Sequence, residues 1–290
     1  MVAVVALGYQ DNWVHILESS FMRNAILGGS VVALAAGIIG YFIIVRSSAF
    51  AAHALAHIGF PGATGAVLLG LPVSIGLGVF CVGGALAIGA LGKRADEREV
   101  ATGTILAAAT GLGLFFSSLA TKSSSTVTNV LFGNLLAVTD EQLVTFGVVL
   151  GVIVAVIAFV YRPLLFASVN PEVAEARGVP VRALSVIFMA LLGLSITMAV
   201  QAVGTLLLFA LVVTPAATAI MLTARPGVAI AVATGIALLS VWGGLVVSAM
   251  FNVPPSFVIT TLVSTIWFAT WLADRRRRPA STPLPHGVHG

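Results

Sequence analysis

The sequence predicts an all-α fold, a polytopic membrane helix bundle with about eight to nine transmembrane helices. Of the 290 residues, 59% are hydrophobic and only 8% are charged, and the mean hydropathy is +1.11. A soluble globular domain carries roughly 25% charged residues, so this chain has too few charges to cover a surface that faces water. The 10 acidic residues lie in loops or at segment ends, and long apolar runs separate them.

These runs justify the helices in order. Inside hydrocarbon, every backbone N–H and C=O group has to be paired within its own segment, which makes long apolar runs helical. A transmembrane β-barrel would show alternating segments of about 10 residues, and we find none. The segment from Ala51 to Gly70 contains two His, one Pro and several Gly, which is also typical of a re-entrant or broken span. The segment 126–138 is too short and too polar to span the membrane alone. We predict helices at 24–45, 52–70, 72–91, 99–120, 142–161, 184–202, 204–223, 228–250 and 256–273.

Basic residues set the predicted orientation, because cytoplasmic loops are enriched in Lys and Arg. Alternating the helices across the bilayer places the basic residues of four loops on one side, the cytoplasmic side. We divide the chain into an interfacial N-terminal segment (1–20), a transmembrane domain (21–274) with a cytoplasmic loop at 163–183, and a basic, disordered cytoplasmic tail (275–290). The C-terminus is therefore predicted to be cytoplasmic.

Missing motifs exclude several function classes. The only lysines, Lys93 and Lys122, follow no Gly-rich phosphate loop, so the chain has no motif for ATP hydrolysis. An ion-coupled carrier usually needs a carboxylate within the membrane, and none lies inside a predicted span. Ser123–Ser125 have no neighbouring His, which disfavours an intramembrane hydrolase, and the single Cys81 is typical of a small buried hydrophobe. We expect no enzyme, no nucleic-acid binding, and energy supplied by another subunit.

Two of the five histidines, His53 and His57, lie inside a predicted span. Their i, i+4 spacing in HALAH places both imidazoles on one face of a helix. Two imidazoles on one face can bind one metal ion, and ligand type alone leaves zinc, manganese, copper, iron and nickel open. The alternative is that both side chains bond to a neighbouring helix or line a wet cavity without metal.

A polar stretch, NPEVAEARGVPVRA at 170–183, is the second notable feature. It is helix-prone from Pro171 to Arg177, and Gly178 and Pro180 end the helix. A short helix across the cytoplasmic face suits docking to a soluble partner. The alternative is a surface loop without a partner.

Four stretches in order resemble the zinc/manganese permeases of the ABC-3 family, over roughly residues 21–273. They are SSAFAAHALAHIGFPGATGA (Ser47–Ala66), LFGNLLAVTDEQL (Leu131–Leu143), Glu172–Val179 with the pattern E-x-A-x-x-x-GV, and VGTLLLFALVVTPAATA (Val203–Ala219). The resemblance implies a type II ABC importer-like permease in the inner or plasma membrane of a prokaryote. Its implied partners are a second copy of the permease, an ATP-binding subunit and an extracytoplasmic metal-binding protein. No cofactor is permanently bound, because Zn²⁺ or Mn²⁺ is the transported ion.

The resemblance also assigns residues. His57 matches the family's His, whereas His53 stands where the family has Asp, and two neutral imidazoles favour zinc over manganese. Binding then becomes more sensitive to acid, because protonated His cannot bind a metal. Asn134 stands where many relatives carry Asp or Ser, and Pro215 matches a Pro inside a helix, a static kink or a gating hinge. Coupling to the ATPase is assigned to Pro171, Glu172, Glu175, Ala176, Arg177, Gly178 and Val179.

The sequence thus predicts the permease subunit of an ABC importer that moves a divalent metal ion, zinc first, by alternating access. One alternative is a manganese or iron importer permease of the same family. Another is a siderophore or vitamin B12-type importer permease, which would not need the HALAH pair. An alternative of a different class is a non-transport membrane scaffold, which would need no ATPase partner.

Overall fold

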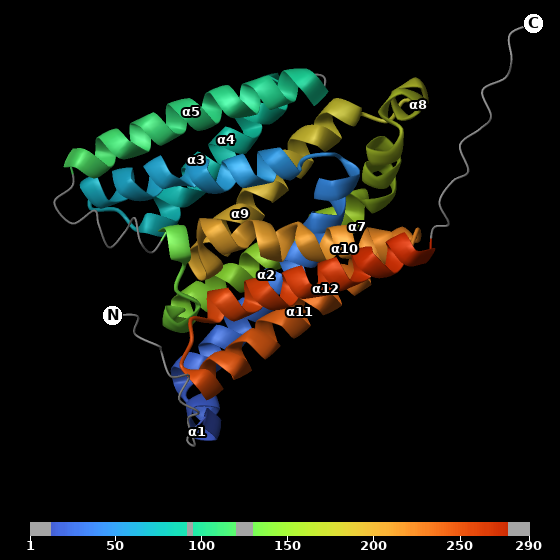
Figure 1. Cartoon of the computed structure of the whole chain (residues 1–290). Coiled ribbons are helices and arrows are strands. Elements are labelled where there is room, and N and C mark those ends of the chain that lie inside the picture. Colours follow the sequence, from blue (N-terminus) through green and yellow to red (C-terminus); the bar gives the residue numbers. More distant parts are fainter. Residues whose placement is uncertain (1–12, 92–94, 120–129, 278–290) are drawn as a thin grey trace, which may run out of the picture.

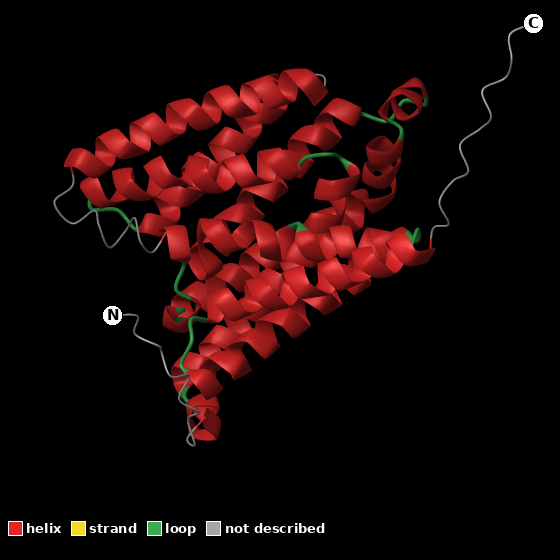
Figure 2. Ribbon diagram, viewed as in Figure 1, coloured by secondary structure: helices red, strands yellow, loops and turns green. Residues whose placement is uncertain are grey.

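The computed structural model describes residues 13–91, 95–119 and 130–277, and over these residues the chain forms helices and no strand (Figure 1, Figure 2). The predicted all-α bundle is therefore confirmed. The elements are α1 (Trp13–Glu18), α2 (Ser20–Val45), α3 (Ala49–Leu68), α4 (Val73–Leu91), α5 (Ala95–Leu119), the 3-10 helix η1 (Leu135–Ala137), α7 (Asp140–Val169), α8 (Pro171–Ala176), α9 (Val181–Val212), α10 (Thr214–Leu222), α11 (Pro226–Phe251) and α12 (Pro255–Arg277).

Seven helical segments within the described residues are long and apolar enough to cross a bilayer. Two further segments match predicted spans without meeting that criterion. One is α3, which contains two His and an internal Pro, and the other is the shorter apolar segment Leu207–Leu222. The seven are α2, α4, Glu99–Leu119 of α5, α7, Val181–Thr205 of α9, α11 and α12 as far as Arg276.

The predicted boundary between 184–202 and 204–223 falls on a sharp turn inside α9. Gly204 has φ 77° and ψ 168°, which no helix contains, so α9 consists of two helical parts joined at this residue. In Figure 1 the ochre part of α9 runs toward one end of the bundle, and the orange part runs back together with α10. The helix predicted at 204–223 is present from Leu207 to Leu222, and only one residue with helical φ and ψ, Val213, divides it into the end of α9 and α10.

Helix α7 is longer than predicted. The sequence suggested an end at 161, before Arg162 and Pro163, but the helix continues to Val169 with Pro163 inside it. A proline removes one backbone donor and bends a helix, yet near a membrane surface water can satisfy the carbonyl that is left unpaired. The first seven residues of the predicted loop 163–183 are therefore helical.

Aromatic packing around α2 holds the centre of the bundle together. Phe42 is fully buried, and its ring centroid lies 6.4 Å from that of Phe188 on α9 and 6.3 Å from that of Tyr161 on α7. Helix α2 and the first part of α9 are the most buried spans, whereas α5 and α12 are the most exposed. Two helices at the rim thus keep a face free for lipid, water or a partner.

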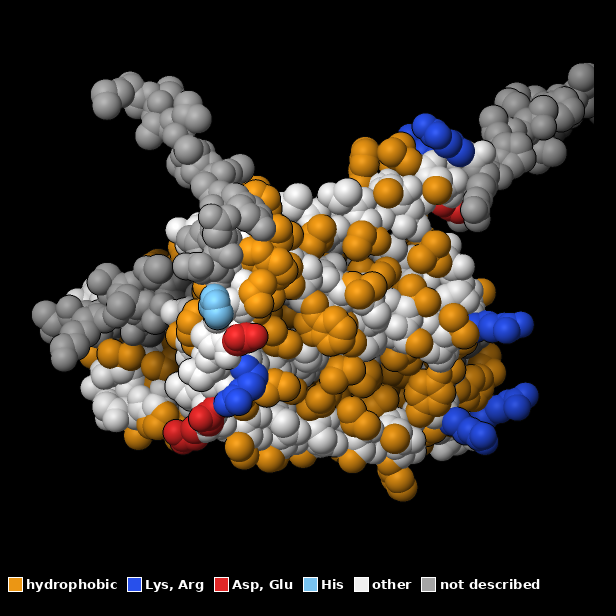
Figure 3. Space-filling view, turned by 90° about the horizontal axis from the view of Figure 1, so that it is seen from below, with side chains coloured by type: hydrophobic (Ala, Val, Ile, Leu, Met, Phe, Trp, Pro, Cys, Tyr) orange, Lys and Arg blue, Asp and Glu red, His pale blue; other side chains and the backbone are white. Residues whose placement is uncertain are grey.

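The described surface has the charge distribution of a membrane protein. Figure 3 shows hydrophobic side chains covering the middle of one face, with charged side chains near its two ends. At one end, the guanidinium carbon of Arg275 lies 4.5 Å from the centre of the Trp271 ring, the kind of aromatic and basic pairing found at membrane surfaces. Arg275 and its two successors belong to the last turn of α12, while residues 1–12 and 278–290 of the predicted terminal segments lie outside the described residues.

Candidate functional site

The histidine pair lies on α3, as its spacing predicted. The imidazole centroids of His53 and His57 are 4.9 Å apart, and both side chains are half-buried. The ring of Phe209, from the second part of α9, packs edge-on against His53 with centroids 5.7 Å apart. Two imidazoles at this separation can approach one ion together, and Phe209 limits access to His53 from the side of α9.

The segment that carries the pair is one unbroken helix, α3, rather than a broken one. Ala49–Leu68 comprises 20 residues, a length of about 30 Å, despite Pro61 in its interior. Its backbone touches that of α4, because a Cβ placed on Gly62 would lie 2.1 Å from the carbonyl oxygen of Gly76. Cys81 of α4 also donates its thiol hydrogen to the Leu55 carbonyl at 3.4 Å. The histidines therefore sit on a helix with a fixed position.

The pair is not a closed metal centre. Among the described residues, no group of three or more His, Cys, Asp or Glu side chains is placed to hold a metal ion. A resident transition metal usually has at least three protein ligands. Two imidazoles fit a transient contact, in which water, hydroxyl groups or a second chain complete the coordination.

The polar loop forms the predicted short helix, α8, and a sharp stop. Asn170 caps it by accepting a hydrogen bond from the Val173 N–H at 3.1 Å. Gly178 has φ +80°, and the following N–H of Val179 donates to the Ala174 carbonyl at 3.0 Å, so the end is a glycine C-cap. Residues 171–178 are exposed except for the buried Ala174. Helix α8 projects from the bundle at the end where α12 finishes (Figure 1).

Asn134 and Pro215 lie far from the histidine pair in the sequence. Asn134 precedes η1 and lines a pocket of about 520 Å³ with Glu141, Gln142 and Gln201, and neither His lines this pocket. Pro215 lies in the first turn of α10, and helical hydrogen bonds from Val213 N–H to the Phe209 carbonyl and from Ala217 N–H to the Val213 carbonyl continue past it. Whether the helix moves at Pro215 stays a prediction.

A contact between two glycines was not predicted. Gly133 and Gly204 both have positive φ, 68° and 77°, and a Cβ on either would lie 2.3 Å from the backbone nitrogen of the other. The chain before η1 and the turn in α9 therefore meet backbone to backbone. The sequence contained a signal, because each glycine lies in one of the stretches LFGN and VGT, but nothing in it pairs the two.

Comparison with known proteins decides the family. The ABC 3 transport family matches residues 18–274. The chain belongs to this family. A manganese transport system membrane protein, MntC, from Halalkalibacterium halodurans is 34% identical over 254 residues, which are 87% of this chain and 87% of the relative. A manganese import system permease protein, ScaB, from Streptococcus pneumoniae is 32% identical over 276 residues, 92% of this chain and 95% of the relative.

A solved structure extends the likeness to three dimensions. PsaBC from Streptococcus pneumoniae, in complex with a Fab, contains a chain similar to this one with a TM-score of 0.80 and 29% identity. The match covers 90% of this chain and 94% of that chain. This ABC-3 chain is therefore a multi-pass membrane protein with the bundle of a transport permease.

Arg46 is a further residue whose importance the sequence did not reveal. In the sequence it directly follows the predicted helix 24–45, where a basic residue indicates only the cytoplasmic membrane surface. In the structure it follows α2, and its guanidinium donates to the hydroxyl of Ser168 at 3.2 Å and to that of Ser185 at 2.5 Å. The guanidinium carbon also lies 5.1 Å from the centre of the Phe188 ring. One cation thus ties α2, α7 and α9 together beside α8.

Proposed function

We propose that this ABC-3 chain is the membrane permease subunit of an importer that carries a divalent metal ion past His53 and His57 by alternating access. The observation that carries the proposal is the imidazole pair, with centroids 4.9 Å apart, on a helix fixed inside the bundle. Residues that are costly to place in a membrane usually serve function, and an importer releases its cargo most easily from an incomplete ligand set.

Manganese is the ion that we propose as cargo. The two relatives described above are named for manganese transport or import, and together they support this ion over zinc. Zinc, which the sequence favoured, is the second candidate. It rests on one observation, that both described metal-binding side chains are imidazoles, because manganese prefers carboxylate and other oxygen ligands.

The proposed energy source is a separate ATP-binding subunit that docks on α8. The exposed side chains of Glu172, Glu175 and Arg177 offer charged contacts, and the glycine cap at Gly178 gives α8 a defined end. Movement of a soluble subunit would reach the bundle through the short connections from α8 to α7 and α9. The absence of a phosphate-binding loop from the sequence supports a partner as the site of ATP hydrolysis.

The proposed assembly contains two copies of this chain, two ATP-binding subunits and an extracytoplasmic metal-binding protein. Arg46, α8 and the basic end of α12 would face the cytoplasm, in agreement with the enrichment of Arg in cytoplasmic loops. The opposite end, with α1 and η1, would receive the binding protein. The C-terminus would then be cytoplasmic.

Uptake by a reconstituted complex tests this proposal. The chain, its ATP-binding subunit and its binding protein are placed in proteoliposomes, and accumulation of Mn²⁺ and of Zn²⁺ is measured with and without ATP. We expect ATP-dependent Mn²⁺ uptake, and Zn²⁺ uptake alone would select the second candidate. If neither ion enters while the bound ATPase is active, an organic-chelate importer replaces the proposal.

The docking role of α8 has its own test. Gly178→Pro cannot adopt positive φ and should leave ATP hydrolysis uncoupled from transport. Full coupling in this variant would contradict the assignment of residues 171–179 to the ATPase contact.

A further inference from the structure

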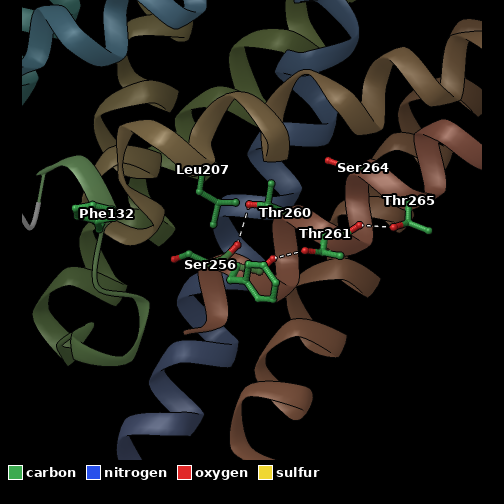
Figure 4. A pocket seen from close by; sticks show the side chains of 8 residues that line it. Phe132, Leu207, Ser256, Thr260, Thr261, Ser264 and Thr265 are labelled. Carbon is green, nitrogen blue, oxygen red and sulfur yellow. Dashed lines mark hydrogen bonds between the residues drawn. The ribbon is translucent and has the colours of Figure 1, made fainter. Parts of the chain in front are cut away.

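A groove runs along α12, and no role has been assigned to it. Its outer hollow, about 560 Å³, is lined by α12 residues and by Phe132 and Leu207 (Figure 4). Its inner hollow, about 690 Å³, lies between α12 and α10 and also includes Phe209. The two hollows share Ser264 and Thr265, so they form one groove. Most of the lining is apolar, and the hydroxyl-bearing α12 residues that interrupt it are Ser256, Thr260, Thr261, Ser264 and Thr265.

The threonines present oxygen lone pairs to this groove. Thr260, Thr261 and Thr265 each donate their hydroxyl hydrogen to the carbonyl four residues earlier, at 2.8, 2.8 and 2.7 Å. Figure 4 shows these bonds along one side of the helix, with Leu207 opposite Thr260. Because the single hydrogen of each hydroxyl is used within α12, the oxygen can act only as an acceptor toward the groove. Acceptors suit water and cations, and they do not suit anions.

The inner end of the groove is separated from His53 by one aromatic ring, and neither histidine lines either hollow. Phe209 lines its inner hollow, and the same ring packs edge-on against His53 at 5.7 Å. The other end begins at Ser256, in the first turn of α12, next to the loop 252–254. In the orientation proposed above, this loop faces the outside. The groove therefore leads from the outer end of α12 to the level of His53.

We propose that this groove is a water-lined wall of the ion path, along which a hydrated divalent cation passes the α12 hydroxyls before it reaches His53. The inference rests on the proposed function for the direction and identity of the cargo. It adds α12 to the histidine helix as a second element of the path. The two competing occupants, lipid tails and a tightly packed helix of a second copy, would both leave the groove dry.

Cysteine accessibility distinguishes a wet groove from a dry one. The chain has one cysteine, Cys81, which is fully buried in α4, so the unaltered chain gives little background. Thr260→Cys and Ser264→Cys are compared with Val152→Cys, which lies in the middle of α7, the span with the highest hydropathy, and is 43% exposed. The probe is a trimethylammonium methanethiosulfonate, which needs a water-exposed thiolate to react. The complex is labelled in proteoliposomes.

We expect fast labelling at 260 and 264, slow labelling at 152, and protection of the two groove positions by Mn²⁺. Labelling at 260 and 264 as slow as at 152 would overturn the proposal, and an oxidant that then cross-links two copies through either cysteine would identify a dry interface instead. Labelling needs no transport, so the groove can prove wet even if uptake fails. Uptake with a dry groove would leave the proposed function intact and remove this inference.

A second measurement uses variants without the hydroxyl oxygens. Thr260→Val and Ser264→Ala remove one acceptor each, and Thr270→Val is the matched control. Thr270 makes the same bond, to the Ile266 carbonyl at 2.8 Å, but lines neither hollow. The double variant should lower metal uptake about tenfold, the effect of losing two modest polar contacts, with ATP hydrolysis unchanged. Equal uptake in the double variant and the control would contradict a role for these oxygens.

Discussion

Substitution of Gly204 by alanine tests the glycine contact that shapes the turn in α9. With φ 77° and ψ 168°, Gly204 has a backbone conformation that is essentially restricted to glycine. A Cβ at this position would lie 2.3 Å from the nitrogen of Gly133 and 2.4 Å from the carbonyl carbon of Phe132. These neighbours are backbone atoms, so no side chain can turn away to make room.

Two costs add in this variant. A side chain in such a strained backbone conformation costs about 1–3 kcal/mol. Crowding against backbone that has to shift costs about 1–3 kcal/mol more. Gly204→Ala should therefore lower the free energy of unfolding by about 2–6 kcal/mol, whereas Gly178→Ala should lose only about 1–2 kcal/mol. Gly178 has φ +80° but no atom within 4 Å of an added Cβ, so it isolates the backbone cost.

Thermal unfolding of the purified chain in detergent measures the series. Gly111→Ala completes it as a control, because Gly111 is helical and exposed with open space around its Cβ position. We expect a ranking of Gly111→Ala, then Gly178→Ala, then Gly204→Ala, from most to least stable. Gly204→Ala should fall by at least about 4 °C, given roughly 2–4 °C per kcal/mol. A midpoint for Gly204→Ala equal to that of Gly111→Ala would refute the backbone contact.

Three further predictions concern single side chains. Arg46→Met should lower the free energy of unfolding by about 2 kcal/mol, because the charged hydrogen bonds to α7 and α9 are lost. Arg225→Met, at an exposed position, should change it little. Equal thermal midpoints for the two variants would show that the Arg46 contacts do not stabilise the bundle. Asn170→Ala removes the cap of α8, at a cost of about 1 kcal/mol, and should weaken stimulation of the ATPase by the permease. Asn170→Asp keeps a side-chain oxygen that can cap α8, so it should leave this stimulation unchanged. His53→Asp should raise Mn²⁺ uptake relative to Zn²⁺ uptake, because a carboxylate is a harder ligand; an unchanged ratio in a competition assay would separate His53 from ion selection.

Much of the fold could be predicted because the bilayer restricts the chain to helices. The start of α4 after Pro72, of α11 at Pro226 and of α12 at Pro255 follows from proline, which suits the first turn of a helix. The end of α7 could not be predicted, because Pro163 is tolerated where water is close. The interruption at Val213 is the kind of irregularity that Pro215 predicted, because a proline has no N–H to donate to the carbonyl four residues earlier.

The candidate site was predictable only where it is local in sequence. The i, i+4 spacing placed His53 and His57 on one face, and the composition of the polar loop predicted α8. Contacts between distant segments carried no such signal. Phe209 packs against His53 although the two lie far apart in the sequence, and Arg46 reaches two serines on other helices. Such contacts depend on how the helices cross, which a single sequence does not encode in any local pattern.

The central claim is that the ion passes the histidine pair, and His57→Ala tests it most directly. ATP-dependent Mn²⁺ uptake into proteoliposomes is measured for the unaltered complex, for His57→Ala and for His15→Ala, whose imidazole is exposed on α1 beside Glu18. The account predicts that uptake is lost in His57→Ala, persists in His15→Ala, and that the ATPase remains bound and active in both. Full Mn²⁺ uptake by His57→Ala would contradict the account.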